Sequence, residues 1–263
     1  FSYNDEGIMA AIKQLYVSYA VSKSIKLTGG SWATHVGYEL VDANLNRNYS
    51  MSYMFTNGPF FHTGIKGEAV LGKSGFMVGI ANPTDYKFIP DGSHTRKTAL
   101  AQYSFAPSDN FKAYLNYVGG AALDSSRSKQ YDVVLITKVS KKLGLAYNGT
   151  YNNTRTHLGN DKLAGARSWW GQAVYINYDP LPNTGFTLRS EYFSDQNRLK
   201  VCSQQPDGGG VWATTLSGNL KRDHFILIPE VRIDAASQPL YTKHSGNTSK
   251  QAVSFLLAAV YSF

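Results

Sequence analysis

The chain has 263 residues, of which 43% are hydrophobic, with a formal net charge of +8 and a single cysteine, Cys202. It contains no apolar run of about 18 residues, which excludes a transmembrane helix, and one cysteine excludes an internal disulfide. The basic residues are scattered, without a basic helix or an RNA-binding motif, which argues against nucleic-acid binding.

Segments of alternating apolar and polar residues recur along the whole chain. The last four, 184–195, 212–221, 224–234 and 250–263, each span about ten residues, the length that a tilted strand needs to cross a bilayer. The predicted strands, about thirteen in number, are in chain order 11–22, 24–34, 62–72, 76–82, 96–106, 111–120, 130–139, 142–153, 169–179, 184–195, 212–221, 224–234 and 250–263. An all-β chain of this kind is either a soluble sandwich or an outer-membrane barrel.

The lengths of the connections decide between these two classes. Tight turns at 22–24, 73–75, 107–110, 140–142, 181–183 and 221–223 alternate with longer loops at 83–95, 121–129, 154–168, 196–211 and 235–249. Outer-membrane barrels have short periplasmic turns and long external loops, whereas a sandwich has no reason to place every short turn at one end. We therefore predict one domain over 1–263, a transmembrane antiparallel up-and-down β-barrel in the bacterial outer membrane.

The longest connection, 37–60, reads GYELVDANLNRNYSMSYMFTNGPF. It lies where an external loop is due, but it is too apolar and aromatic for a solvated loop. We interpret it as a constriction loop that folds inward against the barrel wall; the alternative is a lid packed on the rim. The polar residues expected near the channel axis are Glu39, Asp42, Asn44, Asn46 and Arg47.

Alternation also sorts side chains between lipid and lumen. In 224–234 the odd positions are apolar, while the even positions include Glu230, Arg232 and Asp234. The same parity gives the predicted pore-lining set Lys66, Glu68, Arg96, Lys112, Asp132, Lys138, Arg189, Glu191, Glu230, Arg232 and Asp234. With Lys26 this makes seven cations against five carboxylates, and the loop trims the excess of two to one, so we expect a weak anion preference.

Signals for catalysis are weak. The six histidines show no paired metal spacing, and no nucleophile elbow, Walker loop or H-E-x-x-H motif occurs. We therefore predict no enzyme, no cofactor and no metal. At the start of 169–179, Trp170 fits an interfacial aromatic girdle, and Trp169 could line the mouth as a stacking platform for saccharides. The glycine run DGGG at 207–210 is interpreted as a flexible loop.

An ordered set of short motifs resembles a known family. They are AIKQLYVSYA at 11–20, GYELVDANLNRNYSMSYMF at 37–55, GPFFHTG at 58–64, LNYVGG at 115–120, SWWG at 168–171 and EYFSD at 191–195. With them the chain resembles the β-barrel porins of Bacteroidota outer membranes along nearly its whole length. That resemblance implies about three more strands before QLYVSYA, and so 14 to 16 strands in the intact protein; a complete chain would instead close with about 12 or 14.

The predicted function is a porin that lets small hydrophilic solutes diffuse through a water-filled barrel. The alternatives are a plugged structural barrel that serves as a subunit or anchor of an envelope complex, and a barrel enzyme. Expected partners are outer-membrane lipid, lipopolysaccharide, the barrel-insertion machinery, and further copies or an envelope complex, with no nucleic acid. Resemblance to outer-membrane barrels in general implies that the terminal aromatics Tyr261 and Phe263 form the assembly signal.

Overall fold

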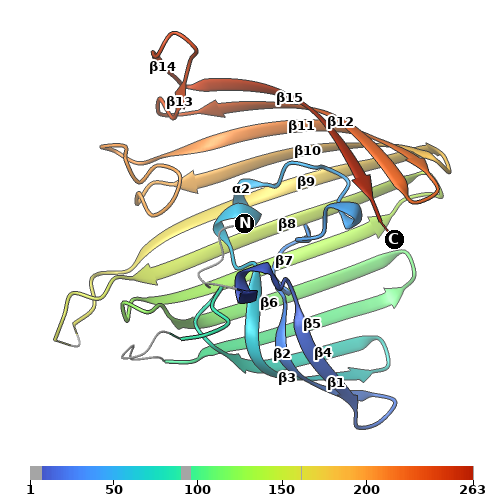
Figure 1. The fold of residues 1–263 in the computed structure, drawn as a ribbon, viewed down its shortest axis with the longest axis vertical. Coiled ribbons are helices and arrows are strands. Elements are labelled where there is room, and N and C mark those ends of the chain that lie inside the picture. Colours follow the sequence, from blue (N-terminus) through green and yellow to red (C-terminus); the bar gives the residue numbers. More distant parts are fainter. Residues whose placement is uncertain (1–7, 90–95, 161, 263) are drawn as a thin grey trace. The chain divides into compact units, whose positions relative to one another are not determined.

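The computed structural model describes residues 8–89, 96–160 and 162–262. These residues form one up-and-down antiparallel sheet of thirteen strands, in the order β1 to β12 followed by β15 (Figure 1). The strands are β1 (Leu15–Ala20), β2 (Ile25–Ala33), β3 (Phe61–Leu71), β4 (Ser74–Ala81), β5 (Thr98–Ser108), β6 (Phe111–Ala121), β7 (Arg127–Lys138), β8 (Leu143–Arg155), β9 (Arg167–Leu181), β10 (Thr184–Asp195), β11 (Gly209–Arg222), β12 (Phe225–Ala236) and β15 (Gln251–Tyr261).

Short elements occupy some of the connections. They are α1 (Ile8–Ala11), the 3-10 turn η1 (Ala43–Leu45), α2 (Tyr53–Asn57) and the small hairpin β13 (Tyr241–Thr242) with β14 (Thr248–Ser249). Within the described residues, every helix is too short or too polar to cross a membrane.

The all-β, up-and-down prediction is confirmed, with thirteen strands in the described residues. β10 has the predicted bounds, and the short connections fall where tight turns were expected. β1 is shorter than the predicted 11–22: Ala11 belongs to a helical turn, residues 12–14 are irregular, and 21–24 form the turn to β2. The described structure ends at 262, so the expectation for Phe263 stays a prediction; Tyr261 is 64% exposed at the end of β15.

The interpretation of 207–210 as a flexible loop was wrong for Gly209 and Gly210. Gly209 and Gly210 belong to β11, where they pair with Asp195 and Ser194 of β10. A Cβ at Gly209 would lie 2.4 Å from the Ser237 hydroxyl oxygen. Glycine is therefore needed at 209 because Ser237 approaches the backbone closely there, and not because the loop is flexible.

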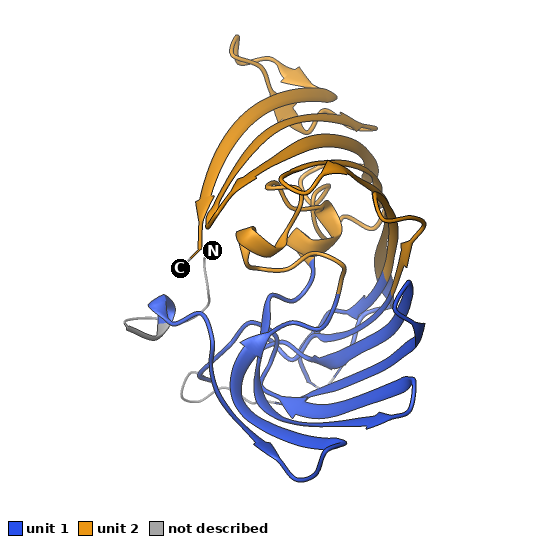
Figure 2. Ribbon diagram, turned by 90° about the vertical axis from the view of Figure 1, so that its right-hand side faces the viewer, with its two compact units in different colours: residues 1–36, 58–133, 151–167 blue, residues 37–57, 134–150, 168–263 orange. Residues whose placement is uncertain are grey.

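By its contacts the chain divides into two compact units (Figure 2). Unit 1 comprises 1–36, 58–133 and 151–167, and unit 2 comprises 37–57, 134–150 and 168–263. Unit 1 has an apolar core made by Trp32, Val36, Met77, Ala81, Leu100 and Val118. In unit 2 the segment 37–57 lies against one face of the strands, which we call the inner face (Figure 2).

The two faces of unit 2 differ as the alternation predicts. Along β10, Thr187, Arg189 and Glu191 are buried on the inner face, while Phe186 and Leu188 are exposed on the outer face. β12 repeats the pattern with the opposite parity. The outer face therefore presents aliphatic and aromatic side chains, as a lipid-facing surface does.

Candidate functional site

The segment 37–57 is held on the inner face of unit 2 by its own backbone. Gly37 has φ +95°, a left-handed conformation that suits glycine and turns the chain after β2. The Tyr38 N–H then donates to Asn148 Oδ1 over 3.2 Å. From there the segment passes across β9 to β12, with η1 and α2 as its regular turns.

Arg189 of β10 is the centre of this contact. Its guanidinium is fully buried and ion-pairs with Glu39 of the segment. It also donates to the Ser50 carbonyl oxygen over 2.7 Å and to Thr215 Oγ1 over 3.1 Å. Glu191, two residues along the same strand, has a carboxylate oxygen 3.5 Å from Arg189 Nε. One arginine thus joins two wall strands to two points of the segment.

Carboxylates bind the backbone N–H groups of 49–53. Glu230 accepts from Tyr49 over 2.8 Å and from Ser50 over 3.0 Å, while Glu191 accepts from Tyr53 over 2.8 Å. The segment's own Glu39 accepts from the Ser52 N–H over 2.7 Å. Buried backbone donors need partners, and charged acceptors make the stronger hydrogen bonds. These hydrogen bonds therefore fix the backbone of the segment in one position on the wall.

A second arginine extends the network toward the β13–β14 hairpin. Arg232 Nη2 lies 3.0 Å from Asp234 and 3.5 Å from Glu191, and Arg232 Nη1 donates to the Met51 carbonyl oxygen over 2.8 Å. Its guanidinium lies 4.8 Å from the centre of the Tyr53 ring. The Tyr53 hydroxyl is 3.0 Å from that of Tyr241 in β13, and burial raises the pKa of Tyr53.

The end of the segment that forms α2 is apolar and packs against the inner face. Met54 and Phe55 are buried, and Met54 contacts a cluster that includes Trp169 and Phe193, whose rings are stacked 5.2 Å apart. A Cβ at Gly171 would lie 2.5 Å from Met54 Cγ, so a glycine is required beneath the methionine. The saccharide-platform interpretation of Trp169 was wrong, because this side chain is only 1% exposed.

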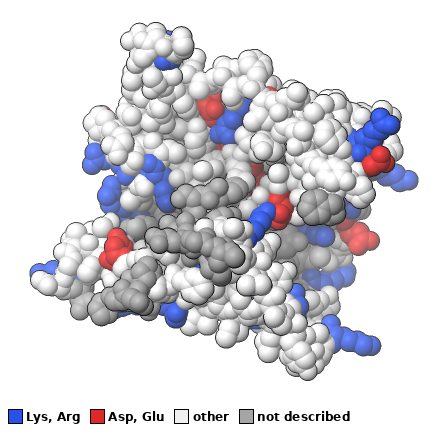
Figure 3. Space-filling view, viewed as in Figure 1, with Lys and Arg blue, Asp and Glu red and all other residues white. Residues whose placement is uncertain are grey.

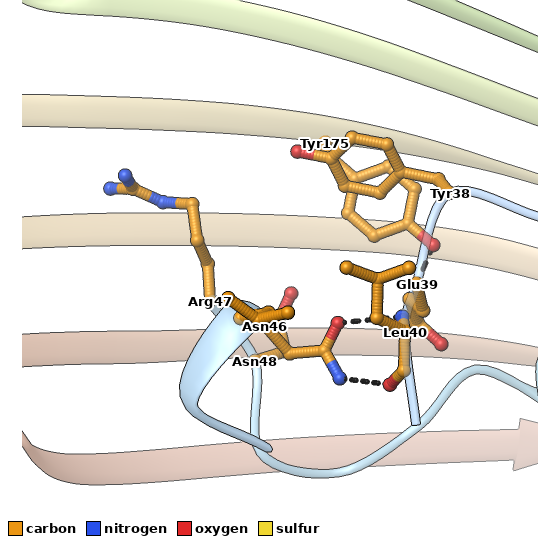
Figure 4. Close-up of a pocket in the computed structure, with 8 residues that line it drawn as sticks. Tyr38, Glu39, Leu40, Asn46, Arg47, Asn48 and Tyr175 are labelled. Carbon is orange, nitrogen blue, oxygen red and sulfur yellow. Dashed lines mark hydrogen bonds between the residues drawn. The ribbon is translucent and has the colours of Figure 1, made fainter. Parts of the chain in front are cut away.

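The other end of the segment encloses a small cavity. Its volume is about 220 Å³, and the residues that line it are Tyr38, Glu39, Leu40, Leu45, Asn46, Arg47, Asn48 and Tyr175 (Figure 4). The Asn46 amide bonds both the N–H and the carbonyl of Leu40 and closes the turn, as the dashed lines show. Arg47 reaches to the wall, where it pairs with Asp179 over 2.7 Å and donates to Thr187 Oγ1.

The remaining predicted site residues do not belong to the network around Arg189. In unit 1, Lys66 and Glu68 ion-pair over 3.5 Å, and buried Asp132 accepts from Asn116 over 2.7 Å. Lys112 and Lys138 are exposed near the short-turn ends of β6 and β7. Arg96 is exposed and precedes β5, which begins at 98 rather than at 96. In the segment, Asp42 is half-buried and Asn44 is exposed.

The expectation of a water-exposed charged wall requires correction in unit 2. Arg189, Glu191, Glu230 and Asp234 lie on the predicted face but are buried, because the segment or neighbouring side chains cover them. Sequence reasoning missed Asp179, Asn48 and Ser217, which also hold the segment. The sequence feature that could have identified them is a polar side chain on the inner parity of a strand or within the segment. No cluster of three or more metal-ligating side chains occurs among the residues described.

The loop 196–208 of unit 2 is anchored by Asp195. Its carboxylate accepts the N–H groups of Leu199, Lys200 and Cys202 over 2.7 to 2.9 Å. The Cys202 thiol is fully buried, and this burial, followed by the charge of Asp195, raises its pKa to about 11.

We expect the Cys202 thiol to react slowly with maleimide at pH 8, because it is inaccessible and because little of it is thiolate there. The labelling rate should keep rising above pH 9 instead of levelling off. Asp195→Asn should accelerate labelling about tenfold by loosening the loop, whereas Asp207→Asn, an exposed change in the same loop, should not. Rapid labelling of the unchanged folded protein would contradict the burial of this thiol.

The model of the family "Putative beta-barrel porin-2, OmpL-like" matches residues 2–263. The solved structure "Outer-membrane expressed OmpT of Vibrio cholerae" is 12% identical with a TM-score of 0.61, covering 95% of this chain and 80% of that one. A second structure of OmpT of Vibrio cholerae, folded in vitro, is 13% identical with a TM-score of 0.58, covering 93% and 86%. At these identities the likeness concerns the fold. The search of curated proteins found no match.

Proposed function

The chain belongs to the OmpL-like family of β-barrel porins, and on this premise we propose that it is an outer-membrane porin for passive diffusion of small hydrophilic solutes. The observation that supports this most is the segment 37–57, fixed on the inner face of unit 2 by buried Arg189 and by Glu230. A rigid segment on a lumenal wall narrows a channel without closing it, and sets which solutes pass by bore and charge.

Planar-bilayer recording of the purified full chain tests this proposal. An open porin gives stable conductance steps that grow with salt concentration. Silent, correctly folded protein would favour the alternative of a plugged barrel that serves as a subunit or anchor. We propose no catalytic role, and hydrolysis in a screen against peptides and phospholipids would contradict that.

The proposed channel has a weak anion preference. Lys26, Lys112 and Lys138 are exposed on the predicted lumenal parity, whereas the carboxylates of Asp132 and Glu191 are buried. Charges in a wide aqueous channel are screened over about 8 Å, so the bias should be small. We expect the reversal potential in a KCl gradient to favour chloride by about twofold.

Lys138→Gln should reduce that preference, while Lys73→Gln, an exposed lysine on the β3–β4 turn and outside both strands, serves as the matched control. A clear cation preference in the unchanged protein would contradict the assignment of these lysines to the lumen.

A further inference from the structure

A pit interrupts the apolar outer face of unit 2. Phe186 pairs with Gly218 across β10 and β11, and Pro229 pairs with Leu257 across β12 and β15. Gly218 and Pro229 face each other, because the register of β11 and β12 continues from Ser217↔Glu230 to Leu220↔Leu227. One rung of the sheet therefore has two small residues between two large ones. The resulting depression has a volume of about 490 Å³.

Large exposed side chains form the walls of this pit. Phe255 is 83% exposed and Leu257 68%, and Leu216 and Val231 border the other sides. The floor is low because Gly218 has no side chain; a Cβ there would point at the Pro229 ring, 3.3 Å from its Cγ. Glu230 also borders the pit, but its carboxylate lies on the inner face, bound to Tyr49 and Ser50. The outer surface of the pit thus offers hydrocarbon and no charged group.

Basic residues lie at the level where a lipid attached to this pit would place its headgroup. Arg222 is on the outer parity of β11, four residues and about 13 Å beyond Gly218. Lys221 is exposed at the end of the same strand but on its inner parity, and Lys141 and Lys142 are exposed on another short turn of unit 2. The carboxylate of Asp223 is exposed at the β11–β12 turn. Figure 3 shows Lys and Arg atoms along the right-hand edge of the upper half, where the short turns of unit 2 lie in Figure 1.

We propose that this surface binds one anionic phospholipid, with an acyl chain in the Gly218–Pro229 pit and the phosphate against Arg222. In a tilted strand, 13 Å along the chain corresponds to roughly 10 Å of depth, which lies within one leaflet of a hydrocarbon core about 30 Å thick. A second copy of the chain fits less well. Two copies with the same orientation in one membrane would bring their Arg222 side chains together at one level, where like charges repel.

The test is native mass spectrometry of the full chain folded in detergent, titrated with phosphatidylglycerol or with phosphatidylcholine of the same acyl chains. We expect one retained phosphatidylglycerol per protein. Gly218→Leu should weaken retention of both lipids about threefold by filling the pit, since van der Waals packing is what distinguishes the pit from surrounding lipid. Arg222→Gln should lower the preference for phosphatidylglycerol about fivefold and leave phosphatidylcholine unchanged.

Matched controls are Thr214→Leu, an exposed outer-face position of the same strand, and Lys73→Gln, on a short turn of unit 1. Should Gly218→Leu fail to fold, Phe255→Ala removes a wall without crowding and should weaken retention as well. Unchanged retention in the folded pit variants would overturn the proposal. So would a dimer that Gly218→Leu or Phe255→Ala dissociates, since a second copy would then be the occupant.

Discussion

Arg189→Met should lower the unfolding temperature and raise the single-channel conductance of the protein. The substitution leaves the buried carboxylates of Glu39 and Glu191 without their principal cation. Removing one partner of a buried ion pair costs about 3–5 kcal/mol, because the remaining charge is desolvated and uncompensated. The protein can reduce that cost by releasing Glu39 into water, and Glu39 belongs to the segment. Local release should therefore accompany the loss of stability.

The measurement is thermal unfolding in detergent together with bilayer recording of the same preparation. The variant in which Arg189→Met is combined with Glu39→Gln and Glu191→Gln should recover most of the stability, since replacing a whole buried ionic group is often nearly neutral. Leu188→Met, on the outer face of the same strand, is the matched control. An Arg189→Met protein with unchanged unfolding and conductance would show that the pair does not hold the segment.

The sequence predicts the faces of the strands more reliably than the contacts made on them. The period of two placed Arg189, Glu191 and Glu230 on the inner face correctly, because one buried face fixes the register of a strand. It could not show that they are covered. Arg189 meets Glu39 from 150 positions away in the chain, and no local pattern encodes a contact of that separation.

The absence of long-range contacts from the local sequence pattern also explains the assignments that the structure contradicts. Trp169 and Trp170 alternate between faces as expected, but the burial of Trp169 depends on Met54 arriving from another part of the chain. The composition of 37–60 did indicate packing, since apolar and aromatic residues in a long connection need cover. Its acidic and arginine residues looked like solvent-facing groups because their partners, among them Asp179, lie on distant strands.

The use of carboxylates to hold this segment has a physical reason. Residues 49–53 lack a helix or a strand ladder for their first N–H groups, and those of Tyr49, Ser50 and Tyr53 point at carboxylates of the wall. Three carboxylates satisfy four of them, and two arginines then offset part of the negative charge. The covered wall therefore keeps more acidic than basic groups, in contrast to the net charge of the whole chain. The segment covers that imbalance.

Deleting residues 40–54 and closing the gap with a short Gly-Ser linker should raise conductance roughly twofold if the segment narrows the channel. The same deletion should shift the reversal potential toward cations. It uncovers Asp179, Glu191, Glu230 and Asp234 against Arg189 and Arg232, four carboxylates against two guanidinium groups. In the intact protein these charges are paired or buried, whereas in the deletion variant they face water and act on permeating ions within a Debye length.

A deletion elsewhere separates this effect from a general loosening of the barrel. Removing 243–246 shortens the exposed tip between β13 and β14 by a smaller number of residues and leaves the wall network intact, so conductance and selectivity should stay unchanged. Unaltered conductance in the 40–54 deletion would place the segment away from the narrowest part of the channel. Raised conductance without a shift toward cations would instead mean that the uncovered carboxylates remain neutralised by their arginines. The two readouts therefore test the position of the segment and the charge beneath it independently.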